Sequence, residues 1–176
     1  TCQTFSGSWG YHRDENTWKS ANQLIVMLIE TVSKGGNLLL NVGPTARGNF
    51  DYRAVERLQQ IGDWMTFNSK SIYGCTAAPE KYQAPKNTFL TYNKETNRLY
   101  IHLLQYPFKT LYLPDYNGKV KYAQFLHDNS ELKYRESPTA KSSEHMAITA
   151  GANDLIMDLP VVKPNVEIPV IELILK

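Results

Sequence analysis

The segment from Asn37 to Pro44 constrains the fold more than any other part of this sequence. It reads Asn-Leu-Leu-Leu-Asn-Val-Gly-Pro, a continuous apolar run without the alternation of a half-exposed strand. Such a run is typical of a parallel strand that is covered on both faces. Helical patterns flank it at residues 20–32 and 51–67. The order of helix, buried strand, loop and helix predicts part of an α/β sheet or barrel.

The two helices differ in how much of their surface is apolar. The helix at residues 20–32 is apolar around most of its circumference, so we expect it to be buried on most sides. Asn16 or Thr17 can cap its N-terminus, and Gly35-Gly36 can end it. We expect the second helix to bury one stripe, while Arg53, Glu56, Arg57 and Gln60 face water. The stripe consists of Val55, Leu58, Ile61 and Met65.

One strand between two helices cannot complete a sheet. A strand this apolar needs parallel neighbours at its edges and helices on both faces, yet the pattern predicts no second parallel strand in the chain. The chain also starts at Thr1, with neither an initiating Met nor a signal peptide. We therefore expect a fragment of a longer protein, in which residues before Thr1 supply the rest of a sheet or barrel.

The pattern changes to short strands in the second half of the chain. Ala78-Pro79 and Ala84-Pro85 bound a linker-like stretch, which predicts one domain at residues 1–77 and another at 78–176. About eight short strands at this spacing predict an antiparallel β-sandwich, so the fold class is α/β and then all-β. The predicted strands are residues 88–92, 98–104, 110–113, 119–125, 131–134, 147–149, 155–159 and 168–175.

Charge and composition exclude several classes of function. The 19 basic and 17 acidic side chains are spread along the chain, so a nucleic acid is not an expected partner. No apolar stretch reaches about 18 residues, so no membrane partner is expected. Cys2 and Cys75 lack the spacing of metal ligands, and His102, His127 and His145 lie far apart. We expect no metal and no cofactor.

Four motifs resemble a known enzyme family when they are taken together and in order. They are Ser8 to His12, Val32 to Pro44, Ile61 to Trp64, and Ser71 to Gly74. Their sequences and spacing resemble those of the family 29 glycoside hydrolases, the α-L-fucosidases. The resemblance is strong over residues 1–76, and it extends weakly to Asn97 to Leu103 and Pro107 in the second half.

The resemblance implies the end of a (β/α)8-like barrel followed by a C-terminal β-sandwich. It also implies hydrolysis of terminal α-L-fucose by double displacement with retention, using an Asp nucleophile and a carboxylic acid/base. In the family both groups lie upstream of the segment that matches this chain, so no catalytic residue is expected here. The expected partners are a fucosylated glycan or fucoside and the N-terminal barrel portion of the same enzyme. A homo-oligomer is possible, and the family suggests a secreted, periplasmic or lysosomal location.

Two residues of the first motif are candidates for substrate binding. Trp9 matches the aromatic position that walls the fucose pocket in the family; the alternative is a core tryptophan next to the first helix. His12 can hydrogen-bond a substrate hydroxyl; the alternative is an ordinary loop residue. Asn41 either orients a pocket residue or, with Gly43, simply ends the strand in a turn.

Other features leave the function open. We expect Trp18 and Trp64 to lie on helices and to face the barrel or the second domain.

A second hypothesis for the function is a non-catalytic carbohydrate-binding or interaction module, since exposed tyrosines on a sandwich often bind sugars. The tyrosines concerned are Tyr92, Tyr100, Tyr106, Tyr112, Tyr122 and Tyr134. A third hypothesis is that the chain is one piece of a split or nicked fucosidase whose two pieces stay associated.

Overall fold

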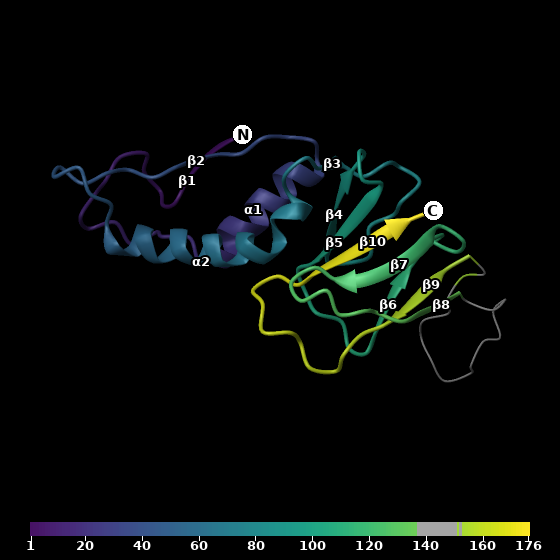
Figure 1. The fold of residues 1–176 in the computed structure, drawn as a ribbon. Coiled ribbons are helices and arrows are strands. Elements are labelled where there is room, and N and C mark those ends of the chain that lie inside the picture. Colours follow the sequence, from purple (N-terminus) through teal and green to yellow (C-terminus); the bar gives the residue numbers. More distant parts are fainter. Residues whose placement is uncertain (137–150, 152) are drawn as a thin grey trace.

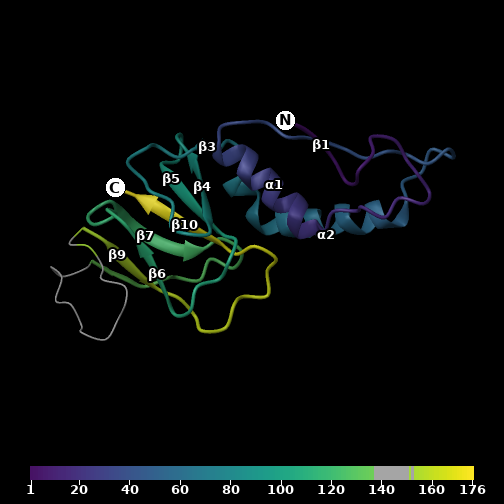
Figure 2. The same ribbon diagram turned by 180° about the vertical axis from the view of Figure 1, so that it is seen from behind.

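A computed structural model describes residues 1–136, 151 and 153–176, and Figures 1 and 2 show it from opposite sides. Two helices and a pair of short strands form the N-terminal part, and the remaining strands form two antiparallel sheets. The elements are β1 (Cys2–Thr4), α1 (Ala21–Ser33), β2 (Leu39–Asn41), α2 (Tyr52–Asn68), a 3-10 turn (Ser69–Ser71), β3 (Thr76–Ala77), β4 (Thr88–Asn93), β5 (Arg98–Leu103), β6 (Thr110–Leu113), β7 (Val120–Phe125), β8 (Tyr134–Glu136), β9 (Leu155–Asp158) and β10 (Val170–Leu175).

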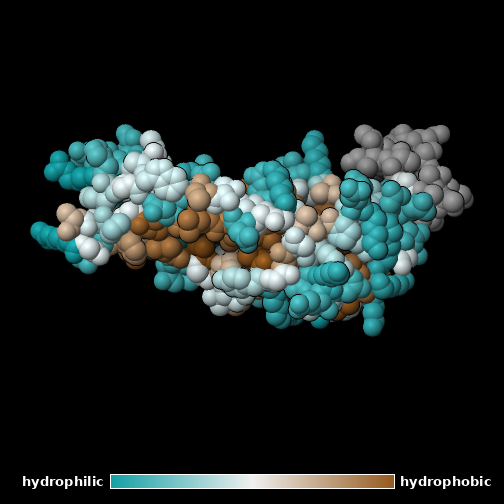
Figure 3. Space-filling model, turned by 90° about the horizontal axis from the view of Figure 1, so that it is seen from above, coloured by the Kyte–Doolittle hydropathy of each residue, from teal (hydrophilic) through white to brown (hydrophobic). Residues whose placement is uncertain are grey.

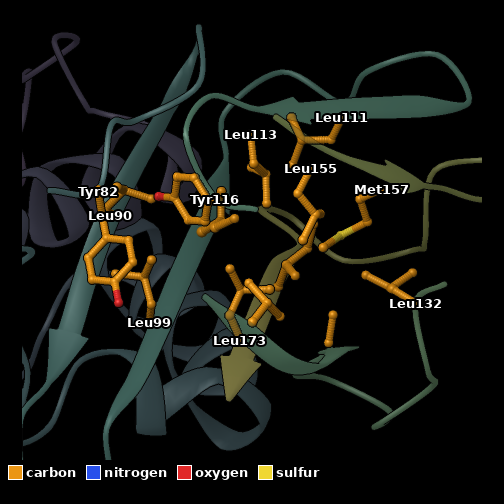
Figure 4. Close-up of a cluster of buried hydrophobic side chains, with 14 of the residues drawn as sticks. Tyr82, Leu90, Leu99, Leu111, Leu113, Tyr116, Leu132, Leu155, Met157 and Leu173 are labelled. Carbon is orange, nitrogen blue, oxygen red and sulfur yellow. The ribbon is translucent and has the colours of Figure 1, made fainter. Parts of the chain in front are cut away.

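The C-terminal part is a sandwich of two antiparallel sheets, as the sequence predicts. One sheet has the strand order β3-β4-β5-β10-β7, and the other has the order β6-β9-β8. Alternate side chains of each sheet point toward the other sheet, for example Leu99 and Ile101 of β5 and Leu155 and Met157 of β9. Figure 4 shows Leu99, Leu155 and Met157 among the buried side chains that lie between the sheets. They form the core of the sandwich.

The helices cover the opposite face of the five-stranded sheet. Tyr100 of β5 and Val170 of β10 point away from the sandwich core and pack with Ile25 of α1 and Trp64 of α2. The Trp64 indole Nε1–H donates a hydrogen bond of 2.9 Å to the carbonyl oxygen of Ile168, before β10. Trp64 therefore lies on a helix and faces the second half of the chain, as the sequence predicts.

Helix α1 begins after Ser20, so the prediction of Asn16 or Thr17 as its N-cap is wrong. The Gln23 N–H donates to Ser20 Oγ at 3.2 Å, and the Ser20 N–H donates to Gln23 Oε1 at 2.8 Å. This reciprocal pair is a capping box, which satisfies two backbone donors at the start of the helix. At the other end, Gly35 has a φ of +74° and ends the helix as predicted.

The expectation that the chain holds no second parallel strand is wrong. Strand β1 pairs in parallel with β2, with Cys2 opposite Leu39 and Thr4 opposite Asn41. The prediction missed β1 because three residues are too few to show a pattern. The Leu39 side chain is 65% exposed, so strand β2 is not covered on both faces by the described residues. Two strands do not close a barrel, and the barrel remains a prediction.

The apolar stripe of α2 is buried only in part within the described residues. Val55 and Leu58 are 51% and 38% exposed, and Ile61 and Met65 are only partly buried. The helix instead buries the face that carries Trp64. The expectation of a buried stripe is therefore wrong for Val55 and Leu58, whereas Ile61 and Met65 pack against the core cluster that contains Trp64. Periodicity shows which face is apolar and not which element covers it. Figure 3 shows apolar surface gathered over this helical part of the molecule.

The strand predictions have mixed outcomes. The hairpin at residues 88–92 and 98–104 is confirmed by the antiparallel pairing of β4 with β5. The strand predicted at residues 131–134 instead lies at Tyr134–Glu136, and Glu131 forms only an isolated bridge. The strand predicted at residues 147–149 lies outside the described residues. The boundary between residues 77 and 78 remains a prediction.

No helix among the described residues combines the length and the hydrophobicity that crossing a membrane requires.

Candidate substrate-binding loop

The two predicted site residues lie in the loop between β1 and α1. The Trp9 side chain is 58% exposed, so Trp9 is not part of a core formed by the described residues. His12 is exposed three residues later in the same loop. Both side chains are therefore accessible to a ligand in the structure, and whether they bind substrate remains a proposal.

The end of strand β2 fixes the position of Trp9 in this loop. The Asn41 side-chain amide Nδ2–H donates a hydrogen bond of 2.7 Å to the Trp9 carbonyl oxygen. At Gly43, an added Cβ atom would lie 2.6 Å from the Tyr11 nitrogen and 3.1 Å from the Trp9 oxygen. A glycine is therefore required at position 43 because the two backbones approach each other closely there. The reason is not a positive φ angle at this residue. Asn41 and Gly43 both act on the loop that carries Trp9.

The N-terminus of α2 holds the other side of the loop. Arg53, predicted to face water, donates from Nη1 to the Glu15 carbonyl oxygen at 2.9 Å. Its Nε and Nη2 groups donate to the two oxygens of Asp51 at 2.8 and 3.0 Å, which fixes the guanidinium group. The guanidinium carbon lies 4.8 Å from the centre of the Trp18 ring. Trp18 precedes α1 and is not on a helix, so that part of its prediction is wrong.

The carboxyl groups of Glu15 in this loop and of Asp51 at the start of α2 are held in their ionised form. Hydrogen bonds from Thr17 lower the pKa of the Glu15 carboxyl group, and the hydrogen bond from Arg53 lowers the pKa of Asp51. A glycosidase acid must carry a proton at working pH and therefore needs a raised pKa. Neither carboxyl group suits that role.

His12 and the end of β2 line a narrow hollow beneath the loop. Its wall includes His12, Glu15, Val42 and Gly43, but not Trp9. The structure thus brings His12 and Gly43 together and leaves Trp9 on the outer surface of the loop. Sequence reasoning missed the contribution of Arg53, because its partners are backbone carbonyl groups about 40 positions away in the chain. The described residues contain no cluster of three or more His, Cys, Asp or Glu side chains that could hold a metal ion.

Comparisons with known proteins show which enzymes the chain is similar to. The family model described as Alpha-L-fucosidase matches residues 1–70. An α-L-fucosidase of Dictyostelium discoideum is 38% identical over 109 residues, which is 60% of this chain and 23% of that protein. The human plasma α-L-fucosidase is 44% identical over 68 residues, or 38% of this chain and 15% of that protein. Both of these relatives are named α-L-fucosidases.

Solved structures cover almost the whole chain. Isoenzyme 1 of the α-L-fucosidase from Paenibacillus thiaminolyticus matches 99% of this chain and 39% of its own length, with a TM-score of 0.85 and 34% identity. A family 29 α-L-fucosidase from Bacteroides thetaiotaomicron matches 99% of this chain and 37% of its own length, with a TM-score of 0.81 and 25% identity. The predicted resemblance to family 29 α-L-fucosidases is therefore confirmed. The chain spans less than half the length of these relatives.

Proposed function

We propose that this chain is the C-terminal portion of a retaining exo-α-L-fucosidase that removes terminal α-L-fucose from glycans. The observation that carries the proposal is the match of 99% of the chain to the Paenibacillus α-L-fucosidase at 34% identity. The match includes both the helical part and the sandwich, and it is therefore more specific than the likeness of a sandwich alone. The substrate class is a fucosylated glycan or a simple fucoside.

The proposed mechanism is a double displacement. The Bacteroides relative was solved as a trapped covalent intermediate with 2-fluoro-fucosyl fluoride. A covalent glycosyl-enzyme intermediate is the feature that distinguishes retaining from inverting glycosidases. We assign the nucleophilic Asp and the acid/base to sequence upstream of this chain. The lowered pKa values of Glu15 and Asp51 support that assignment, because neither can serve as the acid.

The partner of this chain is then the N-terminal barrel portion of the same enzyme. Strand β2 exposes Leu39, and helix α2 exposes Val55 and Leu58. Apolar side chains gathered on one part of a surface usually mark a contact with another protein segment. The parallel pair β1–β2 also has free edges in the described residues, to which further parallel strands can add.

Within that enzyme, Trp9 forms an aromatic wall of the fucose pocket and His12 binds a sugar hydroxyl. An exposed indole can stack on the C–H groups of a sugar and exclude water from the site. The hydrogen bond from Asn41 to the Trp9 carbonyl oxygen holds the backbone of this wall. His12 lines the hollow beneath the loop, whereas Trp9 lies outside that hollow.

The test compares Trp9→Ala with Phe108→Ala in the complete polypeptide. Phe108 is 73% exposed and lies between β5 and β6, so its replacement controls for loss of a surface aromatic ring. Trp9→Ala should lower kcat/KM for an aryl α-L-fucoside by about 1–3 kcal/mol of transition-state binding, with an unchanged melting temperature. Wild-type kcat/KM together with a much lower melting temperature would assign Trp9 to the core of the complete protein instead.

The carbohydrate-binding module is the weaker hypothesis. Its motivation was a surface of exposed tyrosines on the sandwich, but none of the six is exposed. Tyr100 is buried, and the other five are partly buried. The hydroxyl groups of Tyr92, Tyr106 and Tyr134 donate hydrogen bonds to groups of the chain itself. Three of the six hydroxyl groups are therefore bonded within the chain, which argues against a sugar-binding surface of exposed tyrosines. A nicked enzyme remains compatible with the proposal.

A further inference from the structure

A cavity of about 430 Å³ lies between the segment that follows α2 and the five-stranded sheet. Ser69, Lys70 and Tyr73 line it from the side of the helix, and Asn93 and Thr96 line it from the turn between β4 and β5. None of its lining residues belongs to the loop between β1 and α1. What the cavity binds is therefore a separate question from fucoside hydrolysis.

Three side chains of the sheet complete the lining, and they are bonded to one another. They are Arg98, Tyr100 and the buried Glu172. Glu172 Oε1 accepts hydrogen bonds from Arg98 Nη1 at 2.6 Å and from the Tyr100 hydroxyl group at 3.2 Å. Its Oε2 accepts from Gln124 Nε2 at 2.6 Å. Donors of the chain itself thus occupy both carboxylate oxygens, and Arg98 balances the charge of Glu172.

The cationic groups of the lining keep donors that no group of the described residues accepts. Lys70 is exposed, and its ammonium group forms neither a hydrogen bond nor an ion pair with them. The Arg98 side chain is 34% exposed and donates only through Nη1, which leaves its Nε and Nη2 groups free among these residues. The other free donors are the Asn93 side-chain amide and the hydroxyl groups of Ser69, Thr96 and Tyr73.

The charges and donors of the lining select the kind of ligand. Lys70 and Arg98 are two cations, and Glu172 is the one carboxylate in the lining. A cationic ligand would be repelled by Lys70 and would find both oxygens of Glu172 already bonded. A neutral ligand would leave Lys70 without a counter-ion. An oxyanion supplies both the negative charge and several acceptor oxygens, which suit an ammonium and a guanidinium group.

We propose that this cavity binds an oxyanion group, a sulfate, phosphate or carboxylate, that is carried by a small molecule. Lys70 pairs with the anion, and the free N–H groups of Arg98 donate to its oxygens. Glu172 does not touch the ligand; it is a positioning residue that fixes the guanidinium group of Arg98. A volume of about 430 Å³ also leaves room for the carrier. The site does not depend on the proposed fucosidase activity.

The test uses the complete polypeptide and four probes that share one ring and differ only at its last carbon. They are D-glucose 6-sulfate, D-glucose 6-phosphate, D-glucuronate and the neutral D-glucose. Saturation-transfer difference NMR titrations at about 20 mM salt, where screening is weak, give the dissociation constants. At least one anionic probe should bind, and its identity shows which oxyanion the site prefers. D-glucose should not bind, and excess L-fucose should not displace the anionic probe.

Three variants locate the binding site. Lys70→Gln should weaken binding of the anionic probe about 3- to 10-fold, and Lys70→Arg should keep it within about threefold because the positive charge remains. Lys94→Gln is the matched control, since Lys94 is exposed in the same turn as Thr96 and does not line the cavity. The proposal is overturned if no anionic probe binds, if D-glucose binds as well, or if Lys94→Gln weakens binding as much as Lys70→Gln. Displacement by L-fucose would assign the probe to the proposed fucose pocket and would overturn it too.

Discussion

His102 of β5 is a buried histidine whose neutral form the fold requires. Its side chain is fully buried, and burial lowers its pKa to about 3. The Thr91 hydroxyl group donates to the Ser71 carbonyl oxygen at 2.6 Å and lies 2.9 Å from His102 Nε2. Because that hydroxyl proton is already used, Nε2 must carry the proton and donate to Thr91 Oγ1. A second proton would sit on Nδ1, which has no partner among the described residues.

This arrangement makes stability depend on pH in a defined direction. The pKa of an unfolded histidine is about 6.5, so above that pH neither the folded nor the unfolded chain binds the proton. The contribution of neutral His102 to the free energy of unfolding is then fully present. Below it the unfolded chain is protonated while folded His102 stays neutral down to a pH of about 3. The free energy of unfolding should therefore fall by about 1.4 kcal/mol per pH unit in this window, or about 2 kcal/mol at pH 5.

The assay is urea unfolding at about pH 7.5 and about pH 5 for the wild type, His102→Gln and His12→Gln. Glutamine can still donate to Thr91 but does not titrate. We expect His102→Gln to lose about 2 kcal/mol less than the wild type between the two pH values. His12 is exposed, so His12→Gln should behave like the wild type. Equal losses in the wild type and His102→Gln would refute the assignment of a buried neutral imidazole.

Two further predictions concern the packing of the helices and the parallel strands. Trp64→Ala should lower the free energy of unfolding by about 3–5 kcal/mol, because it opens a cavity and leaves the Ile168 carbonyl oxygen unpaired. The control, Tyr52→Ala, should lower it by under about 0.5 kcal/mol. If urea unfolding gave similar losses for both variants, the packing of α2 against the five-stranded sheet through Trp64 would be contradicted. Hydrogen exchange on the separate chain should show slow amides in β5 and fast amides at residues 38–42, with both protected once the upstream barrel portion is present. Slow exchange at residues 38–42 in the monomeric chain would instead mark a self-sufficient domain.

The sequence predicts those elements whose pattern is long enough to be read. Helix α2, for example, follows a 3.6-residue period over four turns, and the hairpin of β4 and β5 alternates on both sides of a polar turn. Strand β1 has three residues and no pattern, so it becomes visible only by its pairing with β2. Ser20 was missed as the N-cap because Asn16 and Thr17 are equally good capping residues by type.

The candidate sites could be predicted only in part for a related reason. Trp9 and His12 were found through a motif, and the motif is local in sequence. The contacts that hold their loop come from Asn41 and Arg53, which follow more than 30 positions later. A cavity lined by residues of α1 and α2, by His127 and by residues 165–167 joins four segments from both halves of the chain, and no spacing in the sequence relates them.

The most direct test of the proposed function is hydrolysis of an aryl α-L-fucoside followed by ¹H NMR. The complete polypeptide should release α-L-fucose as the first-formed anomer, since two displacements retain configuration, and the separately purified 176-residue chain should show no turnover. The β-anomer as first product would contradict the retaining mechanism. Turnover by the 176-residue chain itself, free of any larger species, would contradict the assignment of the catalytic carboxylates to upstream sequence, and inactivity of the complete polypeptide would contradict the proposed activity.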